Sequence, residues 1–172
     1  PEDYLKVDVK EIEEDIRQCG LFRSKAKNIR ESCQMIIDNF NGRVPETIEE
    51  LMTLPGVGQK TANVVASNAF GIPAIAVDTH VFRVSNRIGL AYAKTVEETE
   101  KQLERAIDQD KWTKAHHAII FHGRRMCKAR SPQCKECPVN HICVEYGKIR
   151  RKEIRQEKKI NEKKKSGYAS KK

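Results

Sequence analysis

Apolar residues recur at helical spacing along the chain, and no segment shows the strict alternation of apolar and polar residues that marks a half-buried strand. In the segments 8–19 and 24–40, apolar side chains fall about three or four residues apart and would form one stripe on a helix. Gly20 is expected to end the first of these helices, and Ser24 is expected to cap the second. The pattern predicts an all-α protein.

Capping signals predict further helices downstream. Thr47 is followed three residues later by Glu50, and Thr95 by Glu98, which is the spacing of a capping box. Asp78 is placed to cap a helix that begins at the next residue. The helices expected in this part of the chain are 47–54, 61–70, 79–88, 95–107 and 113–126.

The formal charge of +9 comes from the C-terminal end of the chain. Residues 148–172 contain twelve Lys or Arg and three Glu, whereas residues 1–147 contain 21 basic and 21 acidic side chains. The tail is expected to be a frayed helix up to about Lys165 and disordered beyond it. Two interpretations remain open: a solvated tail that aids solubility, or a segment that attracts phosphates and makes binding salt-sensitive. No apolar run reaches membrane-spanning length, so no membrane partner is expected.

Four cysteines near the C-terminus have the spacing of a metal site. They are Cys127, Cys134, Cys137 and Cys143, with six, two and five residues between successive members. Because four thiolates on short loops can surround one positively charged centre, the pattern favours a bound metal or cluster over disulfides. Structural zinc sites favour two close cysteine pairs, whereas only Cys134 and Cys137 form such a pair here. An iron–sulfur cluster is therefore expected, with zinc as the alternative.

A turn that contains Gly56, Val57 and Gly58 separates the expected helices 47–54 and 61–70. Glycine accepts backbone angles that other residues resist, so the turn can point successive N–H groups outward. Together with the unsatisfied N–H groups of the following helix, these would bind a phosphate of one DNA strand whatever its sequence. The alternative is an ordinary helical hairpin without a ligand.

Lys60 follows this turn at the positive end of the next helix. The helix dipole and partial burial would both favour the neutral amine, which is the nucleophilic form. On an exposed surface, Lys60 would instead be one more phosphate contact. Asp78 is the nearest chemical partner in the sequence, because a carboxylate that caps a helix is fixed in place and can share a proton with the amine.

The motifs LPGVGQKTANVV, AFGIPAIAVDTHVFRVSNRIGL and HHAIIFHGRRMC, together with the four-cysteine spacing, resemble the endonuclease III family of the helix-hairpin-helix DNA glycosylase superfamily. The resemblance extends from about Pro1 to Cys143. The domains expected are a helical lobe over 1–112 with the helix-hairpin-helix at about 47–70, an iron–sulfur cluster lobe over 113–147, and a basic, disordered tail over 148–172.

The family removes oxidised pyrimidines from duplex DNA and cleaves the abasic site that results. The resemblance implies that Lys60 attacks C1′ of a flipped nucleotide and forms a Schiff base, that Asp78 stabilises charge at the sugar and handles the proton, and that β-elimination breaks the strand 3′ to the lesion. It implies that Leu21 is a wedge in the gap left by the flipped nucleotide, and that Lys128 and Arg130 contact the DNA backbone. The four cysteines would hold a [4Fe-4S] cluster.

The partner implied by the resemblance is double-stranded DNA with damaged pyrimidines or abasic sites, bound by a monomer in the bacterial cytoplasm and associated with the nucleoid. Pro1 falls at an internal position of the family pattern, so an N-terminal helix and the apolar helix after it are missing from this sequence. The chain alone is therefore expected to be unstable or weakly active. The alternative function is a non-catalytic helix-hairpin-helix DNA-binding fragment with a metal-bound lobe.

Overall fold

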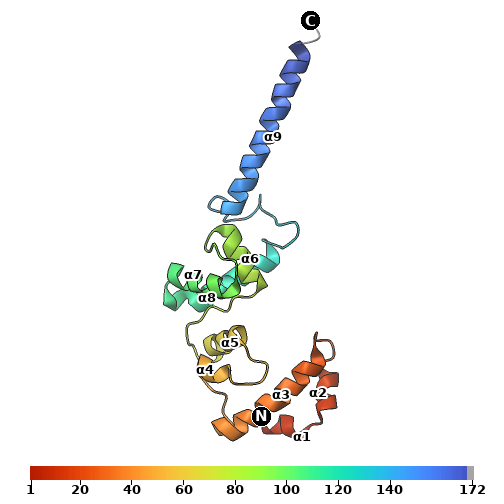
Figure 1. Ribbon diagram of the computed structural model, residues 1–172, viewed down its shortest axis with the longest axis vertical. Coiled ribbons are helices and arrows are strands. Elements are labelled where there is room, and N and C mark those ends of the chain that lie inside the picture. The colour runs from red at the N-terminus through yellow and green to blue at the C-terminus, as the bar shows by residue number, and fades with distance from the viewer. Residues whose placement is uncertain (170–172) are drawn as a thin grey trace. The chain divides into compact units, whose positions relative to one another are not determined.

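The computed structural model describes residues 1–169, and it describes side chains up to residue 162. In this part of the chain all regular elements are helices, which confirms the predicted all-α class. The helices group into two compact units, Pro1–Ala76 and Val77–Lys172 (Figure 1). The predicted division into lobes over 1–112 and 113–147 stays a prediction.

The first unit begins with two short helices and one long helix, and a helical hairpin follows them. Its helices are α1 (Glu2–Lys6), α2 (Val9–Asp15), α3 (Phe22–Phe40), α4 (Ile48–Leu51) and α5 (Gln59–Ala69). Helices α1 and α2 both pack on α3 (Figure 1). The carboxylate of Asp8 accepts a hydrogen bond of 2.8 Å from the backbone N–H of Lys10 and so caps α2.

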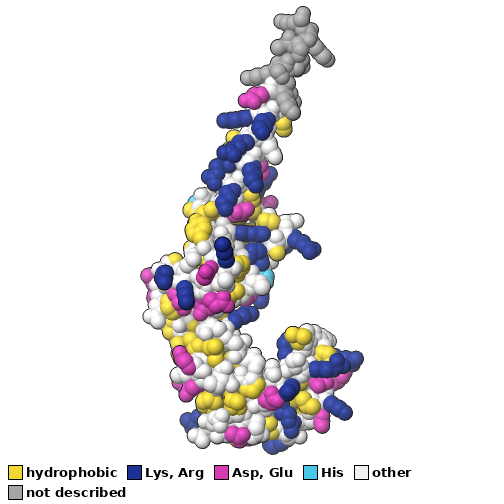
Figure 2. Space-filling model, in the orientation of Figure 1, with side chains coloured by type: hydrophobic (Ala, Val, Ile, Leu, Met, Phe, Trp, Pro, Cys, Tyr) yellow, Lys and Arg dark blue, Asp and Glu magenta, His cyan; other side chains and the backbone are white. Residues whose placement is uncertain are grey.

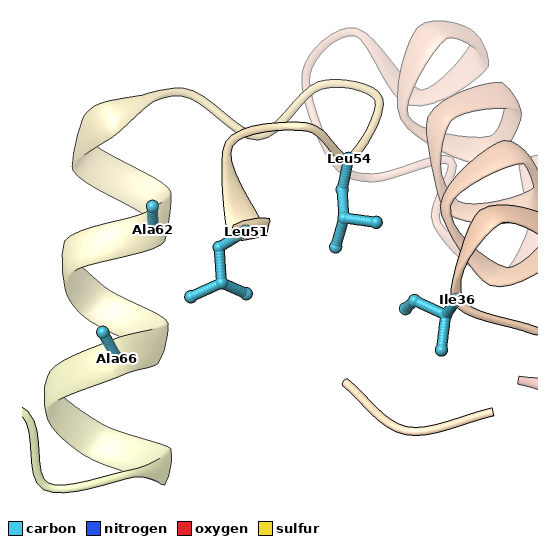
Figure 3. Packing of buried hydrophobic residues seen from close by; sticks show 5 residues of the cluster. All are labelled: Ile36, Leu51, Leu54, Ala62 and Ala66. Atoms are coloured by element: carbon cyan, nitrogen blue, oxygen red, sulfur yellow. The ribbon is translucent and has the colours of Figure 1, made fainter. Parts of the chain in front are cut away.

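The core of the first unit brings α3, α4 and α5 together. Figure 3 shows Ile36, Leu51, Leu54, Ala62 and Ala66, all of them buried side chains of this cluster. The two alanines are completely buried, and their small side chains let α5 lie close to α4. This packing fixes where the hairpin between α4 and α5 lies within the unit.

The second unit contains the remaining helices. They are α6 (Thr79–Ile88), α7 (Val96–Ala106), the short 3₁₀ helix η1 (Gln109–Lys111), α8 (Trp112–Arg125) and α9 (Val144–Ala169). Helix α6 packs on α8 at Gly123, where an added Cβ would lie 3.0 Å from the Val84 side chain and 3.1 Å from that of His80. The absence of a side chain at Gly123 therefore allows the close approach of the two helices.

Three of the predicted caps are confirmed. The carboxylate of Asp78 caps α6, and the hydroxyl groups of Thr47 and Thr95 accept hydrogen bonds of 3.2 Å from the N–H groups of Glu50 and Glu98. These caps depend only on local spacing, which explains why the sequence identifies them.

Other local expectations are wrong. Helix α3 begins at Phe22 with Leu21 as its N-cap, so Ser24 lies inside the helix and does not cap it. Helix α5 begins at Gln59, two residues earlier than expected. The tail was expected to be disordered beyond about Lys165, but α9 continues to Ala169. The last three residues of that expected disorder lie outside the described residues. Across the described residues, no helix is both long and apolar enough to cross a bilayer.

Candidate functional site

The turn between α4 and α5 is held from one side by α3. Gly56 has φ +76°, in the left-handed region, and an added Cβ there would overlap the side chain of Asn28. The hydroxyl of Ser32 donates a 3.1 Å hydrogen bond to the carbonyl oxygen of Pro55. The predicted need for glycine at position 56 is therefore confirmed, both by its backbone angle and by the close approach of Asn28.

Val57 and Gly58 differ from the expectation for this turn. Gly58 has φ −98° and ψ 176°, an extended conformation that any residue can adopt, and an added Cβ would meet nothing within 4 Å. Val57 packs its side chain against the core of the first unit, and its N–H donates to the carbonyl of Leu54 at 3.0 Å. The outward donors of this turn are therefore the first N–H groups of α5, which no side chain caps.

Lys60 is the second residue of α5 and is exposed, so the partial burial expected for its amine is not observed. One turn later, Asn63 is buried and links α5 to the segment that follows it. Its amide donates to the carbonyl of Ile75 at 3.1 Å and accepts from the side chain of Gln59 at 2.8 Å. Sequence reasoning did not select Asn63, although a poor helix former between apolar neighbours is a signal for such a role.

Asp78 is half-buried at the start of α6. One carboxylate oxygen accepts hydrogen bonds of 2.8 and 2.7 Å from the N–H groups of His80 and Val81. These two bonds hold the carboxylate in one orientation. Lys60 belongs to the first unit and Asp78 to the second, so the pairing of their side chains stays a prediction.

Leu21 occupies the end of the loop between α2 and α3. It has φ 59°, in the left-handed region, and is 80% exposed. A left-handed conformation costs a non-glycine residue about 1–2 kcal/mol. Because the Leu21 side chain is exposed, it gains no burial energy within the unit that would offset this cost. A strained and exposed leucine at a loop tip is consistent with a wedge that is buried only against a partner.

The four cysteines of the C-terminal segment lie around one cavity. Cys127, Cys134, Cys137 and Cys143 line one pocket, together with apolar side chains such as Ile88. The structure forms no disulfide among the six cysteines, which agrees with the preference for a bound metal or cluster. Zinc would require its ligands at about 2.3 Å from one ion. Among the described residues, no group of three or more His, Cys, Asp or Glu side chains is arranged to hold a single ion.

The electrostatics of this cavity also favour a multiply charged centre. Burial raises the pKa of the Cys134 thiol, and the charges of Cys127, Cys143 and Cys137 raise it further. Four thiolates in one cavity therefore repel each other unless a positive centre lies between them. The donor set, the shared cavity and its apolar wall fit an iron–sulfur cluster better than they fit zinc.

Two arginines of α6 attach the first cysteine loop to the helix. Arg83 donates to the carbonyls of Cys127 and Gly123, at 3.1 and 3.0 Å. Arg87 donates to the carbonyls of Lys128 and Ala129, at 2.8 and 3.2 Å.

Arg87 also lies 3.7 Å from the sulfur of Cys127, which places a positive charge beside a candidate ligand. Sequence reasoning missed both arginines of α6, because their partners lie 40 or more residues away. Lys128 and Arg130 are exposed on the loop that Arg87 holds, and their contact with DNA stays a prediction.

Two family models match the chain. The model described as "HhH-GPD superfamily base excision DNA repair protein" matches residues 1–109. The model described as "Iron-sulfur binding domain of endonuclease III" matches residues 127–143, the segment from the first to the last of the four cysteines.

Individual relatives agree with these family models. The chain is 54% identical over 146 residues to endonuclease III of Bacillus subtilis, covering 84% of this chain and 67% of that protein. It is 44% identical over 149 residues to endonuclease III of Escherichia coli K12, covering 87% of this chain and 71% of the relative. The chain thus spans about two thirds of the length of these relatives.

Solved structures show the same fold. A trapped covalent intermediate of endonuclease III with DNA matches with a TM-score of 0.81 at 55% identity, over 85% of this chain and 69% of that one. A thermostable thymine-DNA glycosylase matches with a TM-score of 0.74 at 29% identity, over 86% and 70% of the two chains. Together with these structures, the two family models cover the hairpin segment and the cysteine segment.

Proposed function

The chain belongs to the endonuclease III family within the HhH-GPD superfamily of base excision DNA repair proteins, and on this premise we propose that it removes oxidised pyrimidines from duplex DNA and cleaves the strand 3′ to the abasic site. The observation that carries the proposal is the position of Lys60 in the first turn of α5, next to N–H groups that no side chain caps. Within the described residues Lys60 forms no ion pair, so its amine is available to a substrate.

The proposed reaction begins when the Lys60 amine attacks C1′ of a nucleotide that has been flipped out of the stack. The bond between C1′ and the base breaks, and the base leaves with the bonding electrons. Loss of a proton from the attached nitrogen and opening of the sugar ring give a Schiff base at C1′. Removal of a proton from C2′ then expels the 3′ phosphate, which cleaves the strand.

Asp78 would act on charge and protons in this sequence. Positive charge develops at the sugar as the base leaves, and a fixed carboxylate stabilises it without reorganisation. The same carboxylate can accept the proton that the attacking amine releases. Its two hydrogen bonds from the start of α6 support this role, because they fix the oxygen atoms before the substrate arrives.

The hairpin and Leu21 would hold the DNA in the required conformation. The first N–H groups of α5 suit one phosphate of the backbone, which positions the strand without reading its sequence. Leu21 would enter the stack beside the flipped nucleotide, where burial of its side chain offsets part of the cost of unstacking. An oxidised base is already less well stacked, which favours its extrusion.

The cysteine lobe would be structural in this reaction. We propose that Cys127, Cys134, Cys137 and Cys143 hold a [4Fe-4S] cluster, whose iron supplies the positive charge that four thiolates need. The loop that carries Lys128 and Arg130 would then be rigid and would place both cations against the DNA backbone. We also propose that the protein acts on DNA as a monomer, in the bacterial cytoplasm and in association with the nucleoid.

Borohydride trapping on an abasic duplex tests the proposal. Reduction of the Schiff base links protein to DNA, so the wild-type protein should give a covalent adduct and Lys60→Ala none. Lys101→Ala, which removes an exposed lysine on α7, is the matched control and should trap normally. An unchanged adduct in Lys60→Ala would refute the nucleophile. No adduct from a folded wild-type protein would support the alternative, a non-catalytic DNA-binding fragment with a metal-bound lobe.

Base release on a duplex with one oxidised pyrimidine tests the glycosylase step separately. Asp78→Asn keeps the shape of the side chain and a capping oxygen, and it removes the charge. It should bind the duplex and release the base at least about 100-fold more slowly, since a positioned acid–base group contributes about 10²–10⁴-fold. A rate equal to that of the wild-type protein would exclude Asp78 from the reaction.

A further inference from the structure

Helix α9 begins directly after Cys143, and one of its faces is turned toward the cysteine segment. The N–H of Gly147 donates to the carbonyl of Cys143 at 3.0 Å, which joins the start of the helix to the last cysteine. Tyr146, Ile149 and Glu153 line a groove together with the segment from Pro132 to Glu136. This face of α9 is therefore the one that is attached to its unit.

The other face of α9 carries a stripe of basic side chains. At 3.6 residues per turn, six cations fall within an arc of about 120° on the helix surface. Between Lys148 and Lys159 no acidic residue lies on that arc, and Glu162 is the first one beyond them that does. All six are exposed, and Figure 2 shows Lys and Arg side chains along this helix. We call this surface the α9 basic stripe; its residues are Lys148, Arg151, Lys152, Arg155, Lys158 and Lys159.

The charges of the α9 basic stripe are largely uncompensated. Lys148 pairs with Glu145 at 3.5 Å, and the five other cations of the stripe form no ion pair with any described residue. Arg150 lies off the stripe and donates a 2.8 Å hydrogen bond to Glu153. Glu153, on the attached face, is therefore paired with a cation outside the stripe. Helix α9 thus separates its charge: the unpaired cations of the stripe lie on one side, and the acidic residues Glu153 and Glu157 lie on the other.

We propose that the α9 basic stripe binds the phosphate backbone of duplex DNA outside the damaged site, without sequence preference. The identity of the partner rests on the proposed function; the stripe itself rests on the contacts of α9. From Lys148 to Lys159 the stripe extends over about 16 Å, at 1.5 Å per residue, which spans several successive backbone phosphates. Residues 1–147 have equal numbers of basic and acidic side chains, so the excess charge that attracts DNA at long range lies in residues 148–172, the segment that contains the stripe.

A membrane surface is the less suitable partner. A helix that lies in a bilayer interface needs a broad apolar face opposite its cations. The face opposite the α9 basic stripe contains Glu153 and Glu157 between Ile149 and Ile160, and part of it already faces the cysteine segment. The chemistry of α9 therefore fits phosphates in water and not a lipid interior.

The test compares two proteins with the same change in net charge. The stripe variant carries Arg151→Gln, Arg155→Gln and Lys158→Gln, three exposed positions without ion pairs. Glutamine is a good helix former, so α9 is retained.

The matched control removes three exposed cations from the segment around α7. It carries Lys94→Gln, Lys101→Gln and Arg105→Gln, which lowers the formal net charge by the same amount as the stripe variant does. Circular dichroism and visible absorbance near about 400 nm should match the wild-type protein in both variants.

The measurement is the dissociation constant for an undamaged duplex as a function of salt, followed by fluorescence anisotropy. The association constant K falls as salt rises, and each phosphate contact contributes about 0.9 to the steepness of log K against log salt. The slope of the stripe variant should therefore be less steep by up to about 2.7, and that of the control should be almost unchanged. Equal slopes in the two variants would overturn the inference. So would a stripe variant that loses binding to vesicles rich in anionic lipid but keeps its DNA slope.

Trapping with borohydride at saturating abasic DNA separates this inference from the proposed function. The stripe variant should give the same yield of adduct as the wild-type protein once the DNA is saturating, because the stripe contributes affinity and no chemistry. If the wild-type protein fails to trap while the difference in slope persists, the proposed function fails and the α9 basic stripe stands.

Discussion

The two glycines of the hairpin provide the sharpest prediction, because the structure separates residues that the sequence treats alike. Gly56→Ala introduces a methyl group at φ +76°, where it would also lie 2.8 Å from Cγ of Asn28. The left-handed angle costs about 1–2 kcal/mol and the overlap about 1–3 kcal/mol. The free energy of unfolding should therefore fall by about 2–5 kcal/mol, a large part of the 5–15 kcal/mol typical of a domain.

Gly58→Ala is the matched substitution with the opposite expectation. Its extended backbone suits alanine, and the new methyl group meets nothing within 4 Å. Loss of backbone freedom in the unfolded chain should leave the stability unchanged or raise it by about 0.4–1 kcal/mol. If a phosphate docks against the start of α5, however, the methyl group would obstruct it, and duplex affinity should fall at least about tenfold, or about 1.4 kcal/mol.

Urea unfolding and duplex binding, measured on both variants, check these expectations. Asn28→Ala in the Gly56→Ala protein removes the overlapping amide and should restore about 1–3 kcal/mol, leaving the cost of the left-handed angle. If the effects of the two substitutions simply add, the overlap with Asn28 is not the cause. If Gly58→Ala binds DNA as tightly as the wild-type protein, the backbone at this turn does not approach a phosphate.

Three further substitutions test other parts of the molecule. Leu21→Gly relieves a left-handed angle worth about 1–2 kcal/mol, but the new glycine gives back about 0.4–1 kcal/mol through the freer unfolded chain. The free energy of unfolding should therefore rise by at most about 1.5 kcal/mol, while base release slows, as single-turnover kinetics would show; equal rates would exclude a wedge. Arg87→Gln loses hydrogen bonds to two loop carbonyls and a charge beside Cys127, so absorbance near about 400 nm should disappear faster in the presence of an iron chelator, and unchanged kinetics would contradict the role assigned to it. Leu51→Ala opens a cavity in a fully packed core and should cost about 2–5 kcal/mol in a thermal or urea melt; a loss below 1 kcal/mol would show a core that repacks freely.

Local chemistry accounts for the features that the sequence predicts well. Asp78, Thr47 and Thr95 cap their helices because a cap depends on side chains and N–H groups two or three residues apart. The spacing of the four cysteines is similarly local, and it predicts that they surround one cavity. The all-α class follows from hydrophobic periodicity throughout the chain.

Tertiary contacts explain the expectations that were wrong or incomplete. Ser24 has the chemistry of a cap, but the chain enters α3 through the left-handed Leu21, and no sequence rule favours leucine in that conformation. Gly56 and Gly58 differ because Gly56 has a left-handed backbone and is approached by Asn28, whereas Gly58 is extended and open. Arg83 and Arg87 look like exposed helix residues until the cysteine loop is placed beside α6, 40 or more residues away in sequence.

The uncapped start of α5 has a consequence for regulation. A contact made by main-chain N–H groups uses no side chain as a donor, so acetylation, methylation or oxidation of side chains leaves its donors in place. The lysines of the α9 basic stripe are different, because acetylation would remove their charge one at a time. Long-range attraction to DNA could thus be adjusted in small steps, while the hold on a single phosphate beside Lys60 would stay constant.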